Sequence, residues 1–83
     1  MADVEISLKA RDELNALDTP APDRIRSKLL DEVAEHPDRH LVRLSGRDDY
    51  RVRVGDYRVL IDWDKTENVL QVTGVEKRDT VYD

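Results

Sequence analysis

Three arginines in the middle of the chain, Arg51, Arg53 and Arg58, have the residue type and spacing to hold an anion. They flank Gly55-Asp56, which suits a two-residue hairpin turn, so Arg53 should lie directly opposite Arg58, with Arg51 on the same face. Like charges side by side repel one another, so stability does not call for this arrangement. A guanidinium stays charged and offers paired donors to phosphate oxygens. The hairpin therefore predicts a phosphate-binding site.

A purely structural interpretation of these arginines stays open. Arginines on an outer sheet face can be solvated, or paired with carboxylates such as Asp48, Asp49 and Asp62 or those of the helices. Arginine is no ordinary general base near neutral pH, but it can orient a phosphodiester and stabilise a pentacoordinate phosphorane. RNA supplies its own nucleophile, the 2′-hydroxyl group. An arginine site therefore suits RNA chemistry that needs no metal ion.

The elements that must position the arginines follow from the hydrophobic pattern. Alternation along the hairpin places an apolar set on the face opposite the arginines, where a core would form. This set consists of Tyr50, Val52, Val54, Tyr57, Val59, Ile61 and Trp63.

A strand and two helices are expected before the hairpin. The strand covers residues 4–6, and Ser7 then caps a helix that stops before Pro20. Pro22 opens a second helix, which Pro37 ends. The two helices form an antiparallel hairpin with apolar residues at helical spacing. These are Leu8, Ala10, Leu14 and Leu17 in the first helix, and Ile25, Leu29, Leu30, Val33 and Ala34 in the second.

The rest of the chain completes one sheet. Residues 38–49 are expected to be irregular, with Leu41 and Leu44 against the core. After the arginine hairpin, a turn at residues 65–68 leads into a last strand over residues 69–77. The predicted fold class is α+β, in which the N-terminal strand, the helix hairpin and a three-stranded antiparallel meander form a single domain over residues 1–83.

The last strand contains an irregularity at Gly74. Its apolar alternation holds as far as Val72, but the next bulky apolar residue, Val75, is out of phase. A β-bulge at the glycine would return Val75 to the core and turn Glu76 and Arg78 toward the arginines.

The charge of the chain is unevenly distributed. The net charge is −5, but residues 39–58 carry six Arg and three Asp, a local surplus of +3. Local potential decides a contact, so an acidic protein with such a segment can bind phosphates. Asp outnumbers Glu thirteen to six and Arg outnumbers Lys ten to four. This bias indicates either adaptation to concentrated salt or an ordinary small acidic protein.

No metal, cofactor or membrane partner is expected. The chain has no cysteine, and Pro37 destroys the helical spacing between His36 and His40. Asp62 and Asp64 share a strand face without an evident third ligand. No apolar run approaches the length of a bilayer span and no signal peptide is evident, so we expect a cytoplasmic protein.

The residues around the hairpin resemble the RelE/ParE toxin superfamily, and its RelE branch most closely. The pattern that carries the resemblance is Leu44-Ser45-Gly46, then Tyr50-Arg51-Val52-Arg53-Val54-Gly55-Asp56-Tyr57-Arg58-Val59, then Val75-Glu76-Lys77-Arg78 and Val81-Tyr82. The expected order of strands and helices fits as well, so the resemblance covers nearly the whole chain.

The resemblance implies the toxin of a type II toxin–antitoxin pair, a metal-independent endoribonuclease that cuts mRNA on the ribosome and inhibits translation. In the family, the 2′-hydroxyl group attacks the adjacent phosphate. The implied site consists of catalytic Arg58, Arg78 and Tyr82 and of RNA-binding Arg51, Arg53 and Arg47. The implied partners are a cognate antitoxin, the ribosome and mRNA, and the toxin–antitoxin hetero-oligomer would bind operator DNA.

Two other functions stay open. A ParE-like protein would inhibit DNA gyrase by binding it, and a catalytically degenerate member would act as an antitoxin-binding co-repressor. The sequence also departs from the family at Arg51 and Arg53, where lysines are expected. Arginine at these positions fixes the charge and removes any lysine that could act as an acid or base.

Overall fold

The computed structural model describes residues 1–44 and 49–77. Within these ranges lie five strands: β1 (Asp3–Ile6), β2 (Val42–Arg43), β3 (Asp49–Val54), β4 (Tyr57–Asp64) and β5 (Val69–Lys77). The helical elements are α1 (Leu8–Asn15), α2 (Ala21–Lys28), the π-helical turn η1 (Leu29–Val33) and α3 (Pro37–His40).

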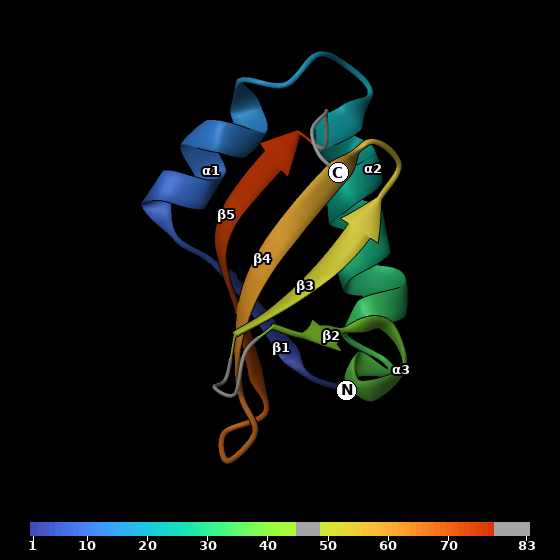
Figure 1. The fold of residues 1–83 in the computed structure, drawn as a ribbon, viewed down its shortest axis with the longest axis vertical. Coiled ribbons are helices and arrows are strands. Elements are labelled where there is room, and N and C mark those ends of the chain that lie inside the picture. Colours follow the sequence, from blue (N-terminus) through green and yellow to red (C-terminus); the bar gives the residue numbers. More distant parts are fainter. Residues whose placement is uncertain (45–48, 78–83) are drawn as a thin grey trace.

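The five strands form one mixed sheet in the order β1-β5-β4-β3-β2. β1 runs parallel to β5, and every other neighbouring pair is antiparallel. The chain rises through α1 beside β5 and returns through α2 on the side of β3 (Figure 1). The α+β class, the helix hairpin and the three-stranded meander are therefore confirmed.

The arginine hairpin has the predicted register. Val54 pairs with Tyr57 and Arg53 pairs with Arg58, around a turn in which Gly55 has a φ of +59°. Glycine reaches this left-handed region at little steric cost. The predicted apolar face is buried or half-buried in the core, which also contains Ala10, Leu14, Ile25, Leu29, Val33 and Leu70. We call the opposite side of the sheet the outer face.

Two leucines predicted to lie in the core are exposed instead. Leu8 is 70% exposed and Leu30 is 54% exposed. At 100° per residue, Leu8 lies about 160° around the helix from the buried Ala10, so it points away from the sheet. Leu30 follows the buried Leu29 and lies beside the buried stripe rather than within it.

Residues 37–44 are more regular than the sequence predicted. Pro37 begins the short helix α3, because proline is tolerated in a first helical turn. Val42 and Arg43 form β2 at the edge of the sheet. Leu41 is buried as expected, but Leu44 is 37% exposed, contrary to expectation. Leu44 follows Val42 by two residues, so alternation directs both side chains to the outer face.

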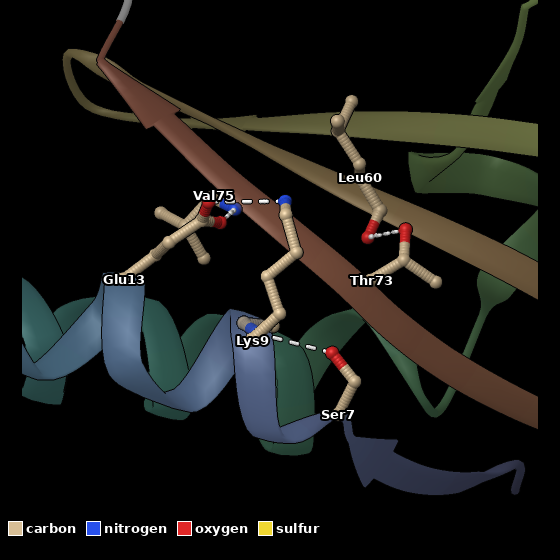
Figure 2. Close-up of polar contacts among 7 residues, drawn as sticks. Ser7, Lys9, Glu13, Leu60, Thr73 and Val75 are labelled. Carbon is tan, nitrogen blue, oxygen red and sulfur yellow. Dashed lines mark hydrogen bonds and ion pairs between the residues drawn. The ribbon is translucent and has the colours of Figure 1, made fainter.

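β5 contains a bulge next to the predicted position. Leu60 pairs with Gly74, whereas the next residue of β4, Ile61, pairs with Val72. Thr73 is therefore the extra residue, and its hydroxyl donates to the Leu60 carbonyl oxygen at 3.3 Å (Figure 2).

The bulge has the predicted consequence for the side chains that follow it. Val75 returns to the core, with 7% of its surface exposed. Glu76 pairs directly with Arg58, so the two side chains share the outer face. Arg78, the third residue of this prediction, lies outside the described residues.

A carboxylate from α1 takes the place of a neighbouring strand at the edge of β5. β1 pairs with β5 only as far as Val72. Beyond this point the Val75 amide donates to Glu13 Oε1 at 2.8 Å, and Lys9 Nζ lies 3.0 Å from Glu13 Oε2 (Figure 2). Ser7 holds the start of α1 by accepting the Ala10 amide at 3.1 Å, as predicted for a capping residue.

The Glu13 contact predicts a pH-dependent part of the stability. The Val75 amide, and after it Lys9, lowers the pKa of Glu13 from its ordinary value of 4.5. A lowered folded-state pKa stabilises the fold above the unfolded-state pKa, and this contribution is lost as pH falls through the folded-state value. We expect Glu13→Gln to reduce the unfolding free energy by about 1 kcal/mol at pH 7.

Urea unfolding at a series of pH values measures this effect. The difference between the wild type and Glu13→Gln should shrink as the pH falls below 4.5. Glu35→Gln, which removes the same charge from an exposed residue, serves as the control. A difference that stays constant across the pH series would contradict the assignment.

Candidate functional site

Arg53, Arg58 and Glu76 form a row across β3, β4 and β5 on the outer face. Arg53 lies opposite Arg58, and Arg58 lies opposite Glu76. Arg58 Nη1 is 3.7 Å from Glu76 Oε1, with the two side chains 32% and 54% exposed. This separation is longer than a hydrogen bond, so the pair is a loose ion pair accessible to solvent.

The next row contains Arg51, which is half-buried and lies opposite Leu60. We call Arg51, Arg53 and Arg58 the arginine cluster. Within residues 1–44 and 49–77, neither Arg51 nor Arg53 forms an ion pair. Two of the three guanidinium groups are therefore available to an anion, and the third shares its charge with one carboxylate.

Lys9 places one more cation at the edge of β5, which the sequence did not reveal. A Cβ atom at Gly74 would lie 3.5 Å from Lys9 Nζ and 3.4 Å from Leu60 Cδ1. Gly74 lies two strands from Arg51 in the same row, and the ammonium group is paired with Glu13 at 3.0 Å, so Lys9 is not part of the arginine cluster. The position depends on α1 lying along the edge of β5, which no local sequence pattern reports.

The other end of the outer face is acidic. Glu5, Asp49, Asp62 and Asp64, which we call the acidic half, come together across four strands. Asp49 lies directly opposite Asp62. Gln71 of β5 pairs with Asp62 on one side and with Glu5 on the other. A hollow of about 590 Å³ is lined here by Glu5, Asp62, Asp64, Glu67, Val69 and Gln71. Asp62 lies four positions after Arg58 on β4, about 13 Å of extended strand, and Asp49 lies two positions before Arg51 on β3, about 7 Å.

The structure therefore brings together Arg51, Arg53 and Arg58 from the predicted site. Arg47, Arg78 and Tyr82 lie outside the described residues, as does Asp48. Asp49 and Asp62, the other carboxylates considered as partners for the arginines, belong to the acidic half and form no ion pair with the cluster. The carboxylate that does so is Glu76, which the bulge places there.

Other kinds of site find little support in the part of the chain that the structure describes. Residues 1–44 and 49–77 contain no group of three histidine, aspartate or glutamate side chains placed to hold a metal ion. None of the helices in these ranges is long and apolar enough to cross a membrane.

Nearly the whole sequence matches one known protein family. The model of the ParE toxin of the type II toxin–antitoxin system parDE matches residues 4–82, which is almost the entire chain. The chain belongs to the ParE toxin family. This membership confirms the RelE/ParE superfamily that the hairpin motif indicated. No protein with a curated description matches this family member in sequence.

Solved structures of RelE proteins share the fold of this ParE-family chain. The toxin–antitoxin complex RelBE2 from Mycobacterium tuberculosis matches with a TM-score of 0.85 and 20% identity, covering 93% of this chain and 98% of the other. The isolated E. coli RelE toxin matches at 0.80 and 22% identity, with coverages of 98% and 88%. The RelE–RelB complex from Pyrococcus horikoshii matches at 0.77 and 22% identity, with coverages of 96% and 98%.

Proposed function

We propose that this ParE-family chain is a RelE-like toxin that cleaves mRNA on the ribosome without a metal ion. The observation that carries the proposal is the arginine cluster, in which Arg51 and Arg53 have no ionic partner in the described ranges. Directly opposed like charges destabilise a sheet. A phosphodiester relieves the repulsion between Arg53 and Arg58, and each guanidinium can donate two hydrogen bonds to it.

The proposed reaction needs positioning and charge stabilisation. The 2′-oxygen attacks the adjacent phosphorus and the bond to the 5′-oxygen breaks, which leaves a 2′,3′-cyclic phosphate and a 5′-hydroxyl group. Negative charge grows on the phosphoryl oxygens in the transition state, where fixed donors act most strongly.

The residues have distinct roles in this proposal. Arg58 stabilises the charge of the phosphorane, and Arg51 and Arg53 hold the RNA backbone. Arg78 and Tyr82 complete the catalytic set and Arg47 the RNA-binding set, a part of the proposal that rests on the sequence motif.

The acidic half limits where RNA can lie. Its carboxylates repel phosphates, and they begin about 13 Å from Arg58 along β4. An RNA strand bound by the arginine cluster is therefore confined to the end of the sheet near the Gly55-Asp56 turn. This confinement favours a short contact with one or two nucleotides over a long nucleic-acid track.

The proposed partners are a cognate antitoxin, the ribosome and mRNA. The structures from M. tuberculosis and P. horikoshii are toxin–antitoxin complexes, which supports the first of these. Binding of operator DNA by a toxin–antitoxin hetero-oligomer is part of the same proposal.

Inhibition of DNA gyrase is the second candidate function. It is favoured by the family description, which is that of the ParE toxin of parDE. In this case the arginine cluster would contact a protein or DNA and no RNA would be cleaved.

Induction of the chain without its antitoxin distinguishes the two candidates. We expect growth to stop and new mRNA 5′ ends to appear within translated codons, mapped by sequencing at the salt concentration native to the cell. Intact mRNA together with broken or unreplicated DNA would overturn the nuclease proposal in favour of gyrase inhibition.

A further inference from the structure

The arginine cluster of the proposed site contains no proton acceptor. Attack by the 2′-hydroxyl group requires that its proton be taken up by a base. Arg51, Arg53 and Arg58 stay protonated at any pH at which the protein functions. The lysines expected at the first two positions are absent. A residue outside the arginine cluster must therefore take this proton.

The bulge places one carboxylate in the required position. Glu76 lies opposite Arg58 on the outer face, 3.7 Å from it, and 54% of its side chain is exposed. Among the described residues it is the carboxylate that forms an ion pair with the arginine cluster. Asp49 lies two residues from Arg51 on the same face but forms no such pair. Glu13, the nearest carboxylate of α1, is already bound to the Val75 amide and to Lys9.

We propose that Glu76 is the general base of the proposed RNA cleavage, an inference that rests on that function. A carboxylate oxygen of Glu76 takes the proton of the 2′-hydroxyl group while the 2′-oxygen forms a bond to phosphorus. The bond from phosphorus to the 5′-oxygen breaks, and this oxygen leaves with a proton from water. Atoms and charge then balance without a metal ion.

The contact between Glu76 and Arg58 fits a reaction in which Glu76 is the base and Arg58 binds the phosphate. In a ribonucleotide the 2′-hydroxyl group and the 3′-phosphate are neighbours, and a reactive geometry holds oxygen and phosphorus about 3 Å apart. The base and the phosphate ligand must therefore also be neighbours, as the 3.7 Å separation makes them. Because this distance exceeds a hydrogen bond, Arg58 can orient the carboxylate without occupying it.

Charged groups lie around Glu76 on β3, β4 and α1. Arg58 faces it from β4, and Arg53 lies beyond Arg58 in the same row on β3. Lys9 and Glu13 approach the edge of β5 from α1 as an ion pair. The alternative role for Glu76 is simply to neutralise Arg58, in which case its removal would free the arginine and leave cleavage unchanged or faster.

Single-turnover cleavage of ribosome-bound mRNA across a pH series tests the proposal. We expect Glu76→Gln to cleave about 100-fold more slowly than the wild type. The dependence of the wild-type rate on pH should change in the variant, because the base has been removed. Glu76→Asp should recover part of the rate. Glu35→Gln makes the same change at an exposed residue outside the sheet and should leave rate and pH profile unchanged.

The outcomes separate this inference from the proposed function. If the wild type cleaves no mRNA, the proposed function fails, and the inference with it. If the wild type cleaves and Glu76→Gln matches or exceeds it, or is slower with an unaltered pH profile, only the general base is refuted. Binding of mRNA with a 2′-deoxy group at the cleavage position should be equal in both proteins, and weaker binding by the variant would also count against the proposal.

Discussion

Replacing Arg58 with alanine should slow mRNA cleavage by about three orders of magnitude, the usual cost of removing one transition-state hydrogen-bond donor. Arg58 occupies the centre of its row, between Arg53 and Glu76. In the proposed reaction, its loss would remove the charge stabilisation and the orientation of the carboxylate together. The effect should appear in single-turnover cleavage on ribosomes and as relief of growth arrest on induction.

Two control variants make the Arg58 result specific. Arg58→Lys keeps the charge but loses the planar pair of donors, so it should recover RNA binding better than cleavage. Arg39→Ala removes the same charge from the exposed surface of α3 and should cleave like the wild type. Because Arg58 is partly exposed, the alanine variant should unfold within a few degrees of the wild type. Undiminished toxicity in a folded Arg58→Ala protein would refute the role of this residue.

Replacing Leu70 with alanine should remove a large part of the stability of the fold. Leu70 is fully buried in β5, between β1 on one side and β4 on the other. Truncation of a buried leucine costs about 2–5 kcal/mol, whereas domains of this size have a total stability of roughly 5–15 kcal/mol. The melting temperature should fall by about 15 °C, since each kcal/mol shifts it by roughly 4–8 °C in a small domain.

Leu30→Ala provides the matched control for Leu70→Ala. It makes the same chemical change on η1, where 54% of the leucine is exposed. Its stability should change by no more than about 0.5 kcal/mol. Both proteins can be compared by thermal unfolding followed by circular dichroism. Equal losses in the two variants would mean that the burial pattern of the sheet has been assigned incorrectly.

The hairpin and the bulge could be predicted because their signals are local. The turn at Gly55-Asp56 determines which residues of β3 and β4 lie opposite one another. The alternation of side chains along each strand then determines which face of the sheet each residue occupies. The phase change near Gly74 similarly required one extra residue, which the structure identifies as Thr73. These two features together define which face Arg53, Arg58 and Glu76 share.

The parts that the sequence did not predict depend on tertiary placement. β2 has two paired residues, too few for alternation to show. Leu8 continued an apolar helical pattern, but the face that α1 turns to the sheet is set by Ala10 and Leu14. Lys9 reaches the edge of β5 at Gly74 because β1 is short and α1 occupies that edge beyond it. The proton-accepting role now proposed for Glu76 required the contact with Arg58 that the structure shows.

The division of the outer face into a cationic and an acidic end also bears on how salt affects an encounter with a polyanion. The longest dimension of the molecule is 34 Å. At about 0.01 M salt the Debye length is roughly 30 Å, so a polyanion is repelled by the entire net charge of −5. At about 0.15 M the Debye length is roughly 8 Å, and the approaching polyanion interacts with the arginine end alone. The association rate should therefore pass through a maximum as salt increases. For a uniformly basic RNA-binding protein, the association rate would instead fall throughout the same range of salt concentration.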